Sequence, residues 1–144
     1  MAKYQKSLIA VDLSQESSEV IERGLAVSNG CNVSLLHVIE PLTFAYGGDI
    51  PMDLSEVQEQ LQSQAQEKLH KLAEQHGIKT ADCQVVVGQP ASEIHRIADE
   101  AEVDLIIVGS HGRSGLALLL GSTSNGVLHG ANCDVLAVRV HPSE

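Results

Sequence analysis

Short hydrophobic runs alternate along the chain with longer stretches in which hydrophobic residues recur every three or four positions. Each run is rich in Val, Ile and Leu and is too short to form a buried helix, so it predicts a strand. The predicted strands are residues 7–11, 33–39, 83–87, 105–108 and 135–140. The stretches between them are long enough for helices with one hydrophobic face.

Four helices are predicted between the strands, each from a start signal. These signals are Ser14 as an N-cap, Asp53 with Glu56 as a capping box, Pro90 in a first turn, and Ser122. The first two helices should end near Gly30 and Gly77. The faces expected to be buried are Val20, Ile21, Gly24 and Leu25 in the first helix, Leu54, Val57, Leu61, Ala65, Leu69 and Leu72 in the second, and Ile94, Ile97, Ala98 and Ala101 in the third.

Alternation of strands and helices predicts an α/β fold, with one doubly wound parallel sheet and helices on both faces. The composition agrees, because 43% of residues are hydrophobic but only 2% are aromatic. Such a core consists of Val, Ile, Leu and Ala, as is typical of buried parallel strands. The 144 residues fit a single domain that needs no disulfide or metal. Residues 40–52 show no clear pattern and are predicted to form a surface loop.

The net charge of −10 argues against binding to nucleic acid or to a membrane surface, because such contacts need clustered Lys and Arg. No hydrophobic run approaches the roughly 20 residues of a membrane span, and no signal-peptide pattern is present, so we expect a cytoplasmic protein. Cys31, Cys83 and Cys133 lack metal-ligand spacing and are expected to be small buried thiols.

Two predicted strands end in residues suited to ligand binding. In doubly wound sheets, ligands bind beyond the carboxyl ends of the strands, where the strand order reverses. The first strand leads into Asp12, and the fourth leads into a segment rich in Gly and Ser. The candidate residues of that segment are Gly109, Ser110, His111, Gly112, Arg113, Gly121, Ser122, Thr123 and Ser124.

This segment has the chemistry of an anion site, such as a site for a nucleotide phosphate. Glycines let backbone N–H groups converge on an oxygen, and a helix starting near Ser122 offers free N–H groups and the positive end of its dipole. Residues 105–133 contain no Asp or Glu in a chain with 19 acidic residues, and Arg113 is their only formal charge. The alternative is a loop whose small residues merely pack tightly.

Neither standard phosphate motif is present. The chain has no G-x-x-x-x-G-K-[ST] and no G-x-G-x-x-G directly after the first strand. Without a phosphate-binding lysine, nucleotide binding is favoured over an enzyme that transfers phosphoryl or adenylyl groups. No positioned base or arginine finger is evident, so any hydrolysis should be slow.

Four segments together resemble the universal stress protein family: residues 9–14 (Ile-Ala-Val-Asp-Leu-Ser), 36–39 (Leu-His-Val-Ile), 109–124 and 134–138 (Asp-Val-Leu-Ala-Val). The resemblance implies a five-stranded sheet in the order 3-2-1-4-5, a homodimer, and binding of ATP, or of ADP or AMP, in a stress-response role. The alternative is a member of the family that binds no nucleotide and acts through dimerisation and protein contacts.

The resemblance also implies which residues contact the nucleotide. In binding members the loop reads G-x2-G-x9-G-[ST], and here eight residues separate Gly112 from Gly121. Leu13 stands where binding members often carry glycine. By this match the contacts are Ala10, Val11, Asp12 and the backbone of Val38 at the nucleoside, and Gly109, Gly112, Gly121, Ser122, Thr123 and Ser124 at the phosphates and ribose. We expect Mg²⁺ as a companion, because an acidic protein with one nearby arginine needs further positive charge to hold a polyphosphate.

Three polar residues near this site each have two interpretations. Asp12 could contact a ribose hydroxyl or a metal, or could cap the first helix or the turn before it. His37 lies in a hydrophobic strand, where a core histidine with a hydrogen-bond partner is more common than a functional histidine. His111 could touch phosphate or could be a solvated loop residue.

The last predicted strand is expected at the edge of the sheet, where unpaired backbone groups must be blocked or paired. Apolar residues alternate between Val135 and Val140, and Arg139 is one mild block. Pairing with the same strand of a second copy would remove the edge. We therefore expect a two-fold dimer through residues 135–140.

Overall fold

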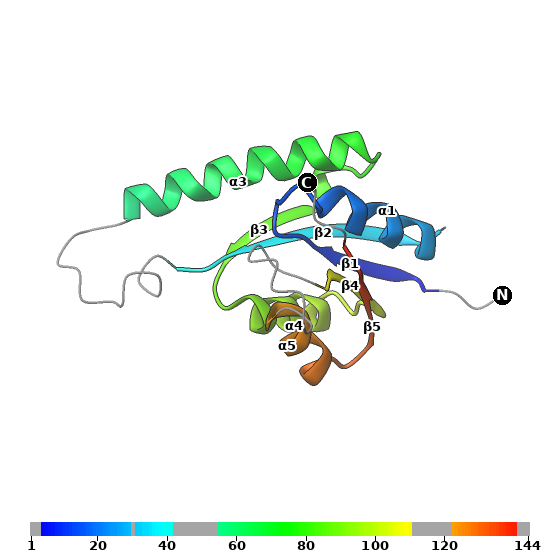
Figure 1. Cartoon of the computed structure of the whole chain (residues 1–144). Helices are drawn as coiled ribbons and strands as arrows, with labels where there is room; N and C mark the ends of the chain where they lie inside the picture. The colour runs from blue at the N-terminus through cyan, green and yellow to red at the C-terminus, as the bar shows by residue number, and fades with distance from the viewer. Residues whose placement is uncertain (1–3, 30, 42–54, 111–121, 141–144) are drawn as a thin grey trace.

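Five parallel strands form the sheet that the hydrophobic runs predict. The computed structural model describes residues 4–29, 31–41, 55–110 and 122–140. Its strands are β1 (Lys6–Ala10), β2 (Asn32–Ile39), β3 (Cys83–Val87), β4 (Leu105–Gly109) and β5 (Asp134–Val138). They lie in the order β3-β2-β1-β4-β5, which confirms the expected order and leaves β3 and β5 at the edges (Figure 1).

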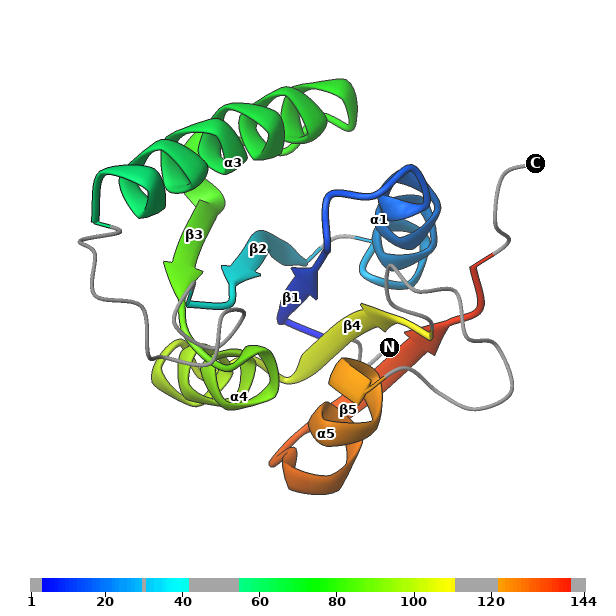
Figure 2. The same cartoon turned by 60° about the vertical axis from the view of Figure 1, so that its left-hand side comes forward.

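Helices cover both faces of this sheet. The helices are α1 (Ser17–Val27), α3 (Ser55–Gln75), α4 (Pro90–Glu100) and α5 (Ser122–Gly130), and a short 3-10 turn, Thr80–Asp82, leads into β3. One face carries α1 and α3, and the other carries α4 and α5 (Figure 1 and Figure 2). Among the described helices, none combines the length and the apolar character needed to cross a membrane.

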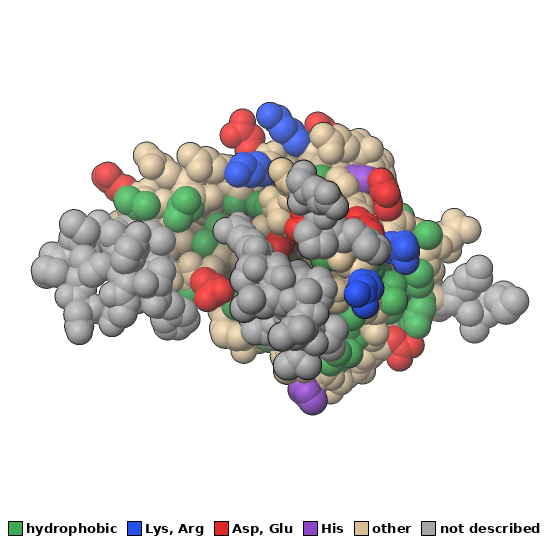
Figure 3. Space-filling view, viewed as in Figure 1, with side chains coloured by type: hydrophobic (Ala, Val, Ile, Leu, Met, Phe, Trp, Pro, Cys, Tyr) green, Lys and Arg blue, Asp and Glu red, His purple; other side chains and the backbone are tan. Residues whose placement is uncertain are grey.

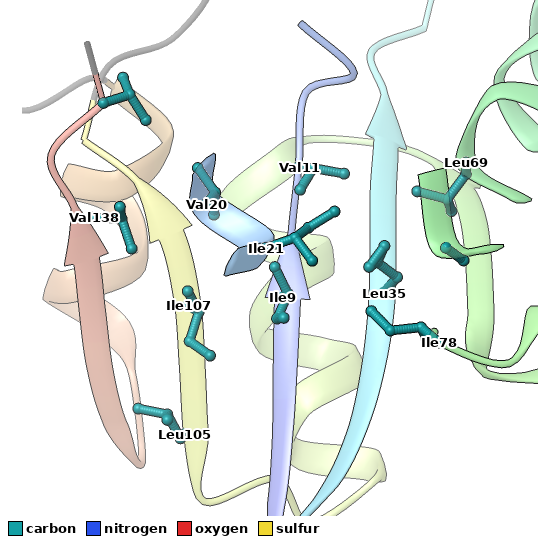
Figure 4. Close-up of a cluster of buried hydrophobic side chains, with 12 residues drawn as sticks. Ile9, Val11, Val20, Ile21, Leu35, Leu69, Ile78, Leu105, Ile107 and Val138 are labelled. Carbon is teal, nitrogen blue, oxygen red and sulfur yellow. The ribbon is translucent and has the colours of Figure 1, made fainter. Parts of the chain in front are cut away.

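Two hydrophobic clusters hold the helices to the sheet, because successive side chains of a strand point to opposite faces. In the α1/α3 cluster, Ile9, Leu35 and Ile107 from three neighbouring strands lie against Ile21 and Leu69 (Figure 4). The α4/α5 cluster on the opposite face includes Leu8, Leu36, Ile94, Ile97, Ile106 and Val127. The central strands contribute to both clusters, which is why their sequences are continuously hydrophobic.

The first half of α3 differs from the prediction. Ala65 is buried as expected, but Val57 and Leu61 are 45% and 37% exposed. None of the residues 55–64 is buried, and this end of the helix extends past the ends of the strands in Figure 1. Hydrophobic side chains lie on the surface there (Figure 3). Spacing identifies the apolar face of a helix, but it does not show how far the underlying sheet extends.

Two smaller predictions are wrong. Ala101 is exposed, because it is the C-cap of α4 and lies beyond the last turn of its buried face. The three cysteines are half-buried and free, not fully buried.

Gly77, predicted to end the second helix, does follow α3, with a φ of 74°. The predicted helix residues Asp53 and Leu54, and most of the predicted loop, lie outside the described residues.

At the amino edge of the sheet, Asp104 ties β1 to the start of β4. Its carboxylate accepts the backbone N–H groups of Gln5 at 2.9 Å and of Lys6 at 3.0 Å. The backbone of Lys6 in turn accepts the N–H of Asp104 at 3.0 Å. The N–H bonds to the carboxylate, led by the one from Gln5, hold the pKa of Asp104 below its ordinary value. The ionised carboxylate therefore stabilises the entry into β1.

Candidate functional site

The carboxyl ends of β1 and β4 lie side by side where the order of the strands reverses. The chain continues from β1 to β2 on one side, whereas β4 lies on the other side of β1. The register pairs Ile9 with Ile107, so the residues that follow the two strands meet at the same edge. This is the place at which open parallel α/β sheets bind ligands.

Asp12 closes the turn between β1 and α1. Its Oδ1 accepts the backbone N–H of Ser14 at 2.9 Å and the hydroxyl of Ser17 at 3.3 Å. The predicted N-cap Ser14 is wrong: α1 begins at Ser17, and its N-cap residue, Glu16, makes no side-chain bond to the helix. Asp12 thus caps the turn that leads into α1, not the helix itself, and contact with a ribose or a metal stays a prediction. Ser17, which the sequence alone did not single out, is the helix residue that Asp12 binds.

Leu13 is held in the left-handed region, with a φ of 62°. A non-glycine residue there costs about 1–2 kcal/mol. The bond from Ser14 to Asp12 spans Leu13, and the half-buried Leu13 side chain packs against the α1/α3 cluster. Together these contacts hold the turn in a conformation that most side chains disfavour.

Val11 links this turn to β2. Its N–H donates to the Leu36 carbonyl at 2.9 Å, and its own carbonyl lies 2.8 Å from Nδ1 of His37. His37 is only 7% exposed. The interpretation of His37 as a core histidine with a hydrogen-bond partner is confirmed.

Ala10 and Val38 lie on the opposite face of the sheet from Val11 and His37. Both are partly buried against the α4/α5 cluster. Val38 pairs with Val86 of β3 and lies two residues beyond Leu36, the last β2 residue that pairs with β1. The structure therefore places these predicted residues at the carboxyl edge, but with side chains on two different faces.

The glycine-rich segment leaves the sheet at a fixed point. Gly109 pairs with Val138 of β5, and the N–H of Ser110 donates to the Val138 carbonyl at 2.7 Å. Ser110 is 6% exposed. The predicted residues His111, Gly112, Arg113 and Gly121 lie outside the described residues.

The segment ends at α5, which packs closely on α4. A Cβ on Gly126 would stand 2.8 Å from the Ala91 Cβ, and Val127 is fully buried. His95 Nε2 lies 2.9 Å from the Val127 carbonyl. The predicted residues Ser122, Thr123 and Ser124 begin this helix. Both ends of the glycine-rich segment are therefore anchored, one to β5 and one to α4.

The fold and this edge define an open parallel α/β protein with the ligand-binding edge of the doubly wound class. The chain belongs to the universal stress protein family, whose model matches residues 3–139. It is similar to universal stress protein A homolog 2 of Coxiella burnetii, with 41% identity over 152 residues that cover 99% of this chain and 100% of that protein. Membership places the chain among stress-response proteins.

Two solved structures show the same fold. The hypothetical protein MJ0577 matches with a TM-score of 0.80 and 31% identity, covering 99% of this chain and 100% of that one. A universal stress protein in complex with cAMP matches with a TM-score of 0.65 and 22% identity, covering 97% and 100%. At that identity the second match supports the fold alone.

Proposed function

We propose that this protein binds an adenine nucleotide (ATP, ADP or AMP) at the carboxyl edge of the sheet and that the nucleotide regulates its interactions in the cytoplasm during stress. Any hydrolysis would be slow, so the role is regulatory and not metabolic. The proposed contacts are Ala10, Val11, Asp12, Val38, Gly109, Ser110, His111, Gly112, Arg113, Gly121, Ser122, Thr123 and Ser124.

One observation carries this proposal: the Asp12 turn and the start of the glycine-rich segment meet where the strand order reverses. Hydrogen bonds fix the Asp12 turn, and β5 holds Ser110 in place. A site whose flanks are fixed in advance loses less entropy when a ligand binds. The absence of Asp and Glu from residues 105–133 favours an anion there. One universal stress protein of this fold was solved with cAMP, itself an adenine nucleotide.

Mg²⁺ would enter this site with the nucleotide. In the part of the chain that the structure describes, no group of three or more His, Cys, Asp and Glu side chains could hold a metal. Asp12 already accepts two hydrogen bonds through Oδ1. The cation would therefore take most of its ligands from phosphate oxygens and water, as Mg²⁺ usually does beside nucleotides.

Thermal unfolding with and without nucleotide tests the proposal. At 100 times its Kd, a ligand stabilises the fold by about 2.7 kcal/mol, which raises Tm by roughly 5–11 °C for a chain of this size. Gly112→Val and Gly121→Val should abolish the shift. Gly77→Ala, in the turn after α3, should lower Tm but keep the shift. If millimolar ATP, ADP and AMP with Mg²⁺ all leave Tm unchanged, the protein binds no nucleotide and acts through protein contacts.

We also propose that two copies pair through residues 135–140, that is, through the outer edge of β5 and the two residues that follow it. The Val138 carbonyl accepts a bond from the β4 side, so the polar groups of Ala137, one residue away, face outward. Ala137→Pro removes that outward N–H and leaves the bonds to β4 in place. Light scattering after gel filtration should find a dimer for the wild type and a monomer for this variant. A wild-type monomer, or a dimeric variant, would refute pairing through β5.

A further inference from the structure

We propose that His37 is a positioning residue for the nucleotide: its Nδ1–H holds the Val11 carbonyl and thereby orients the turn at Asp12. This inference rests on the proposed nucleotide function. It adds to that site a buried side chain that acts through the backbone and not by touching the ligand.

The tautomer of His37 follows from its partner. Nδ1 lies 2.8 Å from the carbonyl oxygen of Val11, and a carbonyl oxygen can only accept a hydrogen bond. Nδ1 therefore carries a hydrogen in either charge state of the ring. With the ring 7% exposed, the bond is sheltered from competition with water.

This bond stands where the backbone ladder between β1 and β2 stops. The N–H of Val11 donates to Leu36, so both polar groups of Val11 face β2. In a continuing parallel ladder, a backbone N–H of β2 would bind the Val11 carbonyl. The His37 side chain supplies a donor for it. The chain can then leave the sheet directly after Val11, and the buried Val11 carbonyl still has a hydrogen-bond donor.

The consequence reaches Asp12, the next residue along the chain. His37 holds the residue before Asp12, and the hydroxyl of Ser17 ties Asp12 itself to α1. Between these two ties, Leu13 is held at a φ of 62°, a conformation that the turn would leave if either tie were lost. The orientation of the Asp12 carboxylate thus depends on His37 as well as on α1.

Two substitutions of similar size test whether the hydrogen bond from Nδ1 to Val11, and not another contact of the ring, positions the turn. The amide nitrogen of Asn is as many bonds from Cα as Nδ1, whereas that of Gln matches Nε2. His37→Asn can therefore still donate to Val11, and His37→Gln cannot. By calorimetry, we expect His37→Asn to bind Mg-ATP within about threefold of wild type and His37→Gln at least about tenfold more weakly.

Ser28→Ala is the matched control. It also removes one buried hydrogen bond, a 2.9 Å bond to Ser7, but at the opposite end of β1. It should lower Tm while changing the Kd of Mg-ATP by less than about twofold, since it lies far from the carboxyl edge. Wild-type affinity in His37→Gln, or equal losses in the Asn and Gln variants, would overturn the proposal.

Amide hydrogen exchange tests the proposal without nucleotide. The Ser14 N–H is protected by its bond to Asp12. Relative to the core amide of Ile107, its exchange should be at least about tenfold faster in His37→Gln and unchanged in His37→Asn. If Ser14 stays protected in His37→Gln, positioning by His37 is refuted whether or not nucleotide binds. If protection is lost as expected but the wild type binds no nucleotide, the proposed function fails and the orienting role of His37 in the turn stands.

Discussion

The hydroxyl of Ser17 donates to Oδ1 of Asp12 over 3.3 Å and so connects the first turn of α1 to the end of β1. The same oxygen accepts the Ser14 N–H at 2.9 Å. Asp12 is therefore part of the fold of this edge before any ligand binds. Substitutions at Asp12 separate this structural role from contact between its negative charge and a ligand.

Asp12→Ala should lower the free energy of unfolding by about 1 kcal/mol, because the hydrogen bonds that cap the turn are lost. Asp12→Asn keeps an oxygen that can accept both bonds, so it should lose much less. Urea denaturation measures both. If only the cap matters, Asp12→Asn should also leave the Kd of Mg-ATP unchanged, whereas a carboxylate that contacts Mg²⁺ would make the same variant bind more weakly. Equal destabilisation by Ala and Asn would contradict the capping role.

Substitutions at two residues in the left-handed region should have opposite effects on stability. Glu102 has a φ of 56° in the turn after α4, and Gly77 has a φ of 74° in the turn after α3. A left-handed side chain costs about 1–2 kcal/mol, and glycine costs about 0.4–1 kcal/mol through the unfolded state, so the net effect is about 0.5–1 kcal/mol.

We therefore expect Glu102→Gly to raise the urea midpoint and Gly77→Ala to lower it. No atom lies within 4 Å of a Cβ built on Gly77, so packing does not contribute to the loss there. A Gly77→Ala variant as stable as wild type would contradict the conformational argument.

The bonds to Asp104 predict a pH-dependent contribution to stability. Its folded pKa lies below the ordinary value of 3.8, chiefly because the Gln5 N–H binds the carboxylate. Such a group contributes stability above its unfolded pKa and loses that contribution as the pH falls through the folded pKa. The urea midpoint of wild type should therefore exceed that of Asp104→Asn at pH 7, and the difference should shrink below about pH 4. A difference that stays constant from pH 7 to pH 3 would contradict this account.

Two of the half-buried cysteines, Cys83 and Cys133, should react slowly with thiol reagents. Burial raises the pKa of Cys83, with a smaller contribution from Asp82, and burial with Asp134 does the same for Cys133. Less thiolate is then present near neutral pH, and the thiolate is the reactive form. Peptide mapping after iodoacetamide treatment at pH 7.5 should show both sites alkylated more slowly than free cysteine. Alkylation as fast as that of free cysteine would show that burial does not protect them.

Much of the fold was predictable because parallel strands covered on both faces leave a clear signal. The run at residues 83–87 coincides with β3, and the other predicted strands differ from the observed ones by one or two residues at an end. The start of α1 was not predictable in the same way. Ser14 has the residue type of an N-cap, but its N–H is bound by Asp12 in a turn through the left-handed Leu13, and the helix begins only at Ser17.

The candidate site was predictable as a location and less so as a set of contacts. The alternation of strands and helices and the residues at the strand ends indicated Asp12 and the segment after β4 without any structural information. The bond of His37 depends on a side chain that reaches across to Val11, the residue after the neighbouring strand β1, and no local pattern reveals it. The exposure of Val57 and Leu61 likewise depends on where the sheet ends beneath α3, and this is a property of the tertiary structure.

The most direct test of nucleotide binding at this edge is calorimetric titration of the purified protein with ATP, ADP and AMP in the presence of Mg²⁺. The account predicts saturable binding of at least one of them, one nucleotide per chain, with binding lost in Gly121→Val while the folded circular dichroism spectrum is retained. No heat of binding from any of the three, or undiminished binding by Gly121→Val, would contradict it.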